Sequence, residues 1–204
     1  WEDINGDNKI NGLDREVVGN IFPKVTGGFS STLSWKGISL YARFDYALGH
    51  TLYNDLAART LGQYQGAFNI ITEVKDMWSE DNPNSDLPAF YYADQLAKKN
   101  IPRSNTGSAS RHNNSSRLYE KADYLALREL TLSWDLPKAW TSKAFIQNAS
   151  VYVTGQNLFY VTGYTGTSPE PVLTNSDNNE NLYGVDQGRY PTPRTVLFGL
   201  SITF

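Results

Sequence analysis

The stretch ISLYARFDYALG, residues 38–49, decides the fold because two kinds of side chain alternate along it. The apolar set occupies the even positions, which are Ile38, Leu40, Ala42, Phe44, Tyr46 and Leu48. The polar or small set occupies the odd positions, which are Ser39, Tyr41, Arg43, Asp45, Ala47 and Gly49. A period of two over twelve residues predicts a β-strand with one apolar and one polar face.

Four further segments carry the same pattern. Val25–Trp35 and residues 195–204 alternate throughout, and residues 149–160 alternate around their valines. In residues 124–136 the leucines change phase near residues 128–129, which predicts a β-bulge. We therefore predict an all-β chain with five long strands.

The predicted connections are short at one end of the strands and long at the other. Lys36-Gly37 fits a two-residue hairpin turn, so the strands are antiparallel, and the connection 137–147 is also short. If the strands alternate up and down, the long segments 50–123 and 161–189 both fall on the opposite side. Within the first of them we expect helical turns around residues 54–65 and 72–78.

Strand length and loop asymmetry favour a membrane barrel over a soluble sandwich. A tilted strand crosses a bilayer in about 9 to 11 residues, whereas soluble strands cluster near about 5 to 6. Outer-membrane barrels have short periplasmic turns, long extracellular loops and aromatic girdles at both interfaces. Four aromatic residues at strand ends match such girdles: Trp35, Trp134, Trp140 and Tyr160. Because a barrel needs about eight strands or more, we expect this chain to be part of a larger transmembrane antiparallel β-barrel.

The composition excludes several functional classes. The chain has no cysteine, which excludes a disulfide framework and a thiolate zinc site. Its net charge is −3 and no basic cluster occurs, so we expect no nucleic-acid partner. No apolar run reaches the roughly 18 to 20 residues of a membrane-spanning helix. Catalytic motifs are absent, and His50 and His112 are isolated, so we expect neither an enzyme nor a histidine metal site.

Four stretches together resemble a known family. They are DINGDNKING at 3–12, YLALRELTLSWDLP at 124–137, VYVTGQNLFYVTGYTG at 151–166 and GRYPTPRTVLFGLSITF at 188–204. In this order they are similar to the C-terminal end of the SusC/RagA family of TonB-dependent outer-membrane transporters of Bacteroidetes. The final Phe204 resembles the aromatic ending that the barrel-assembly machinery recognises.

The resemblance implies an architecture and a function. Such transporters have a barrel of about 22 strands closed by an N-terminal plug, so this chain would supply the last five strands, surrounded by outer-membrane lipids and lipopolysaccharide. Residues 1–23 would form an extracellular loop, and residues 24–204 the strands with extracellular loops 50–123 and 161–189. The resemblance further implies energy from the TonB–ExbB–ExbD complex and a SusD-like surface lipoprotein. We expect active import of an oligosaccharide or oligopeptide; the alternatives are a passive porin or a soluble surface glycan-binding β-domain.

A calcium-type loop lies near the start of the chain. Oxygen ligands recur at the spacing of an EF-hand loop, at Asp3, Asn5, Asp7, the Lys9 carbonyl and Asp14. Asn8 replaces the usual glycine, although asparagine tolerates a left-handed conformation. We expect a structural Ca²⁺; the alternative is an acidic turn that caps itself.

Two other groups of residues are candidates for contacts. Tyr41, Arg43 and Asp45 lie on the polar face of the best strand, so they are expected in the lumen, where they line the solute path or hold the plug, or where Arg43 and Asp45 pair as a structural salt bridge. The long segment 50–123 offers aromatic side chains to a substrate or a partner protein, or folds on itself: Trp78, Phe90, Tyr91 and Tyr92.

Overall fold

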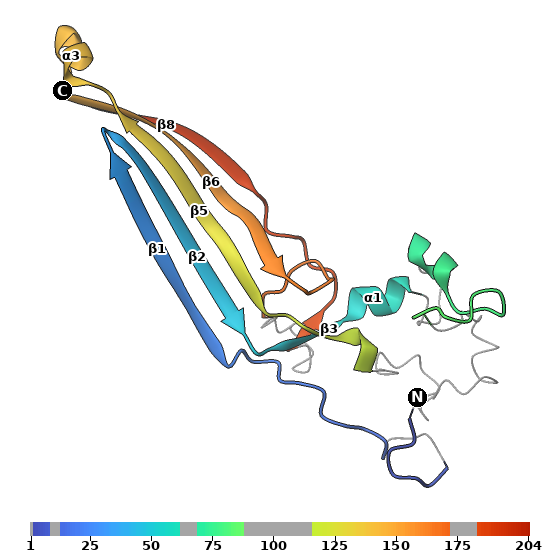
Figure 1. Ribbon diagram of the computed structural model, residues 1–204. Helices are drawn as coiled ribbons and strands as arrows, with labels where there is room; N and C mark the ends of the chain where they lie inside the picture. Colours follow the sequence, from blue (N-terminus) through green and yellow to red (C-terminus); the bar gives the residue numbers. More distant parts are fainter. Residues whose placement is uncertain (1, 9–12, 62–68, 88–115, 172–182) are drawn as a thin grey trace, which may run out of the picture.

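The protein is represented by a computed structural model that describes residues 2–8, 13–61, 69–87, 116–171 and 183–204. Its main feature is one antiparallel sheet of five long strands, drawn side by side in Figure 1. In order across the sheet these strands are β1 (Val25–Trp35), β2 (Ile38–Leu48), β5 (Tyr124–Asp135), β6 (Asn148–Thr162) and β8 (Thr195–Thr203). All five predicted strands are confirmed within two residues of their predicted bounds.

The predicted turn and the predicted bulge are both present. Lys36 (φ 48°) and Gly37 (φ 84°) are left-handed, which is the geometry of the two-residue turn that matches the twist of paired strands. Arg128 is the extra residue of β5, because Glu129 pairs with Arg43 while Leu127 pairs with Phe44. The leucines change phase at this point for that reason.

A small second structure lies at the long-loop end of the sheet. It contains β3 (Thr51–Asn54), β4 (Tyr119–Lys121) and β7 (Val185–Asp186), in the order β4-β3-β7. The sequence did not predict this sheet. Helix α1 (Asp55–Thr60) and the 3-10 helices η1 (Thr72–Asp76) and η2 (Ser116–Leu118) accompany it, and the first two confirm the expected helical turns as far as the chain is described.

The opposite end carries a short helical connection. Between β5 and β6 the chain forms α3 (Lys138–Thr141) and the 3-10 helix η3 (Ser142–Ala144), which project beyond the sheet in Figure 1. The β1–β2 turn lies at this same end, whereas the small sheet and α1 lie at the other. The predicted asymmetry of short and long connections is therefore confirmed for the described residues.

The clusters of buried apolar side chains lie at the long-loop end, around the small sheet and the adjoining ends of β2 and β5. These side chains form three groups: Leu52, Ala122 and Tyr164; Ala47, Tyr124 and Ala126; Tyr53, Ala58 and Leu118. Farther along the sheet large apolar side chains are open, with Leu33 67% exposed and Phe198 82% exposed. Within the described residues the sheet is a single layer. No helix among these residues is long and apolar enough to cross a bilayer.

Candidate functional site

The strand register sorts the five-stranded sheet into two chemically different faces. Residues that are paired across neighbouring strands share a face. One apolar row runs across all five strands through Leu33, Leu40, Leu132, Val153 and Phe198. Because these side chains are not covered by another layer of the described chain, this face is suited to an apolar surrounding and not to water.

The opposite face is polar. The hydroxyls of Thr131 and Thr154 lie 2.7 Å apart across β5 and β6, and Tyr41 is the partner of Thr131 on β2. Arg43 forms an ion pair with Glu129 of β5, with 3.7 Å between Nη2 and Oε2. The face therefore carries the hydroxyl and charged groups that a water-filled lumen accommodates.

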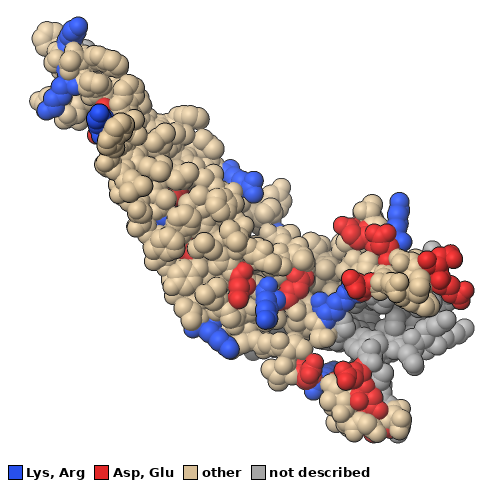
Figure 2. All heavy atoms as spheres, viewed as in Figure 1, with Lys and Arg blue, Asp and Glu red and all other residues tan. Residues whose placement is uncertain are grey.

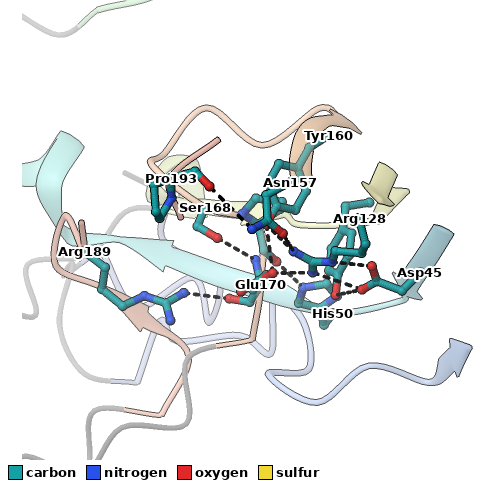
Figure 3. Close-up of polar contacts among 11 residues, drawn as sticks. Asp45, His50, Arg128, Asn157, Tyr160, Ser168, Glu170, Arg189 and Pro193 are labelled. Carbon is teal, nitrogen blue, oxygen red and sulfur yellow. Dashed lines mark hydrogen bonds and ion pairs between the residues drawn. The ribbon is translucent and has the colours of Figure 1, made fainter. Parts of the chain in front are cut away.

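An arginine-centred network dominates the long-loop end of this polar face (Figure 3). The Arg128 guanidinium forms ion pairs with Asp45 of β2 and with Glu170, which lies beyond β6. Arg128 Nη1 also donates to the Tyr160 hydroxyl at 2.9 Å, and that hydroxyl donates to Glu170 at 2.8 Å. The Tyr124 hydroxyl donates to Asp45 at 3.3 Å. The Arg128 side chain is only 18% exposed, so one arginine joins three chain segments in a poorly hydrated position.

Paired bulges position Arg128. Two residues of β6, Asn157 and Leu158, lie opposite the single residue Arg128 of β5. Asn157 adopts φ 51°, a left-handed conformation that asparagine adopts more readily than most residues. A Cβ at Gly155 would lie 2.8 Å from Leu158 Cδ2, so glycine at this position leaves room for the Leu158 side chain. The stretch GQNLF at 155–159 therefore encodes the irregularity that directs Arg128 toward Asp45 and Glu170.

The network fastens the segment after β6 to the polar face. Nε2 of the buried His50 donates to the Pro169 carbonyl at 2.8 Å, and Arg189 donates to the Glu170 carbonyl at 3.0 Å. Nearer to β6, the Tyr164 hydroxyl donates to the fully buried Asp186 at 2.8 Å. Burial, together with this hydrogen bond, raises the pKa of the Tyr164 phenol well above its ordinary value. Residues 163–171 are thus held as an ordered strap that is polar at both of its anchors.

Hydrogen bonds to two aspartates connect the described residues of the calcium-type motif. Both oxygens of Asp3 accept backbone N–H bonds, from Gly6 and Asp7 at one oxygen and from Asn8 at the other. Asn8 has φ 61°, which confirms that asparagine supplies the left-handed conformation. A carboxylate oxygen of Asp14 accepts from the Ile4 amide at 3.1 Å and so closes the loop from its far end. No group of three or more acidic or histidine side chains with metal-site spacing occurs among the described residues.

Comparison with known proteins identifies the family. No protein-family model matches the chain. Two curated proteins of Formosa agariphila, TonB-dependent receptor P3 and TonB-dependent receptor P26, are each 30% identical over the whole of this chain. The solved structure of the RagAB peptide transporter matches 92% of the chain with a TM-score of 0.68 and 28% identity. A RagAB peptide importer in the closed-closed state gives a TM-score of 0.65 over the same share. The chain belongs to the SusC/RagA type of TonB-dependent receptor. It spans about a fifth of the length of these relatives, 19% for P3 and 18% for the RagAB chain.

The structure of this receptor chain corrects two expectations. Arg43 and Asp45 do not pair with each other: each forms its described ion pair with β5, because the neighbouring strand brings Glu129 and Arg128 opposite them. Tyr160 was expected in an outward girdle, but its hydroxyl joins the network on the polar face. Tyr160 and Gln156 are both at even positions of β6 and therefore lie on the same face of the sheet. Gln156 is on the polar face because it is paired with Glu129.

The structure describes only some of the other predicted contact residues of the receptor chain. Trp78 is 43% exposed, and its backbone N–H donates to the Leu87 carbonyl at 2.8 Å, so it belongs to a folded loop. Five residues named in the sequence analysis lie outside the described part of the chain: Lys9, Phe90, Tyr91, Tyr92 and His112. The sequence reasoning missed Arg128 and Glu170 as partners. Arg128 could have been found from the sequence, because it is a charged residue at the point where the leucines of residues 124–136 change phase. No sequence feature indicates Glu170 as its partner.

Proposed function

We propose that this chain forms part of the wall of a transmembrane barrel in the bacterial outer membrane. The observation that supports this most strongly is the apolar row from Leu33 to Phe198 on an uncovered, single-layer sheet. A soluble glycan-binding domain would need a second layer over these side chains, since a large open apolar patch is unfavourable in water. Strands of up to 15 residues are also long enough to cross a bilayer with tilt.

We propose further that the whole receptor imports an oligopeptide or an oligosaccharide actively. The chain's likeness to the RagAB peptide transporter makes peptides the first class to test. Energy would come from the TonB–ExbB–ExbD complex, and a SusD-like lipoprotein would cover the extracellular mouth. In this arrangement the strap 163–171 and the Arg128 network stiffen the lumenal wall below the loops.

Uptake in cells tests the transport proposal. The gene for the full receptor is deleted, and the uptake of fluorescent peptides and fluorescent oligosaccharides is measured with and without a protonophore. We expect one of the two classes to lose uptake on deletion and to lose it equally with the protonophore. Uptake that persists with the protonophore indicates a passive porin, and a receptor that is extracted without detergent contradicts the membrane wall.

We also propose that residues 3–14 bind Ca²⁺ in a structural role. The left-handed Asn8 and the closure of the loop by Asp14 support this, because they bring both ends of the motif together. The ligands would be Asp3, Asn5, Asp7, the Lys9 carbonyl and Asp14. Asp3 would have to exchange some of its backbone hydrogen bonds for the ion.

A further inference from the structure

The short-turn end of the sheet presents an exposed group of aromatic side chains. Trp35 is 69% exposed, Trp134 37%, Trp140 60% and Phe145 92%. Trp134 and Trp140 meet edge to face, with ring centroids 5.9 Å apart and an interplanar angle of 83°. Since Trp134 is paired with Ile38 on the apolar face, this contact places α3 beside the apolar face of the sheet and not beside the polar one.

Phe145 is held in an unusual backbone conformation. Its φ of 59° is left-handed, a conformation that is sterically unfavourable for a bulky residue. Packing of the Phe145 side chain does not compensate for this conformation, because the ring is almost completely exposed. A strained position that displays an aromatic ring points to a contact with something outside the described chain.

The same end is positively charged. Among residues 31–42, 130–153 and 199–204 the charged side chains are three lysines and one aspartate, Lys36, Lys138, Lys143 and Asp135, a net charge of +2. All three lysines are exposed, and the Lys36 ammonium lies 4.7 Å from the Trp35 ring centroid. Figure 2 shows Lys and Arg at this tip, whereas Asp and Glu gather at the long-loop end. The aromatic rings and the lysines therefore occupy one rim beside the apolar face.

We propose that this rim, defined by Trp35, Lys36, Lys138, Trp140, Lys143 and Phe145, binds the phosphate groups of anionic phospholipids. The inference rests on the proposed membrane wall, which puts the rim at the level of the headgroups. Trp and Phe rings sit at the boundary between headgroups and acyl chains, where lysines extend their ammonium groups to phosphate. The positive charge selects anionic over zwitterionic headgroups, because each lysine near such a surface strengthens binding.

Lipid titration of the full-length receptor tests this selectivity. Detergent-solubilised receptor is titrated with phosphatidylglycerol or phosphatidylcholine, and the bound lipids are counted by native mass spectrometry. A variant with Lys36→Gln, Lys138→Gln and Lys143→Gln should lose the preference for phosphatidylglycerol, by about fivefold per lysine that contacts phosphate. The matched control replaces Lys24 and Lys121, which are exposed near the long-loop end, by glutamine and should keep the preference.

The aromatic part of the rim has its own test. Phe145→Asn keeps a residue that tolerates the left-handed conformation but removes the ring. It should weaken the binding of both lipids to a similar degree without making the receptor easier to unfold. Unchanged binding of both lipids would show that the ring does not enter the membrane.

The outcomes separate this inference from the proposed function. If the wild type binds both lipids and the triple glutamine variant keeps its preference for phosphatidylglycerol, the lysine assignment is wrong and the membrane wall stands. If the wild type binds neither lipid, the membrane wall itself is wrong. A rim that binds a periplasmic protein and not lipid would give equal affinities for the two lipids in all variants, which also overturns the inference.

Discussion

Replacing Arg128 by methionine should loosen the strap 163–171 while leaving the strands in place. The change removes a side chain that is 18% exposed and leaves Asp45 and Glu170, which are 33% and 28% exposed, without their cation. Breaking a fully buried pair costs about 3 to 5 kcal/mol, and an exposed pair is worth about 0 to 1 kcal/mol. With both carboxylates partly hydrated, we expect a loss of about 2 kcal/mol, which corresponds to about thirtyfold more opening of the strap.

Amide hydrogen exchange of the full receptor, read by mass spectrometry on peptides covering 163–171, measures this opening. The control is Arg43→Met, because the Arg43 side chain is 55% exposed and its described ion pair is the 3.7 Å contact with Glu129. We expect this control to change exchange in the strap by less than about twofold. Adding Asp45→Asn and Glu170→Gln to Arg128→Met should recover part of the protection, since no uncompensated carboxylate then remains.

Two results would refute this reasoning. Exchange of the strap that stays within twofold of wild type after Arg128→Met would show that the network does not hold the strap. A triple variant that exchanges faster than Arg128→Met alone would show that the loss came from packing and hydrogen bonding and not from uncompensated charge.

Three further changes test other parts of the structure. Leu132→Lys places a charge on the apolar face and should cost about 2 to 4 kcal/mol near the bilayer centre, so folded receptor on heat-modifiability gels should fall, whereas Ser133→Lys on the polar face should not have this effect. Tyr164→Phe should cost about 1 to 3 kcal/mol below pH 10, because Asp186 loses a hydrogen bond in a buried site. The raised phenol pKa means that wild type loses this stability as the pH rises above about 10, the unfolded pKa, so the alkaline limb of the denaturation curve should flatten in the variant. Asp3→Asn should abolish a Ca²⁺-dependent rise in melting temperature, and wild type without such a rise would contradict the calcium proposal.

Local patterns predicted the long sheet well and the loop end poorly. The strand bounds followed from alternation, and the bulge at Arg128 followed from a phase change within one segment. The small sheet could not be predicted this way, because β3, β4 and β7 are two to four residues long and come from distant parts of the chain. The ion pair of Arg128 with Glu170 could not be predicted from local patterns either. The two residues lie 42 positions apart in the sequence and meet only after the strap has folded.

The paired bulges determine which changes in chain length this wall tolerates. β5 carries one extra residue, Arg128, between Leu127 and Glu129, so deleting it would restore regular alternation and leave every other side chain of the strand facing as before. The deletion would remove only the residue that pairs with Asp45 and Glu170. β6 carries two residues, Asn157 and Leu158, at the same level, so removing both would keep every other side chain of the strand facing as before. Related receptors should therefore differ in length at this level without reversing the faces of either strand, and those that lack the extra residue of β5 should also lack its ion pairs.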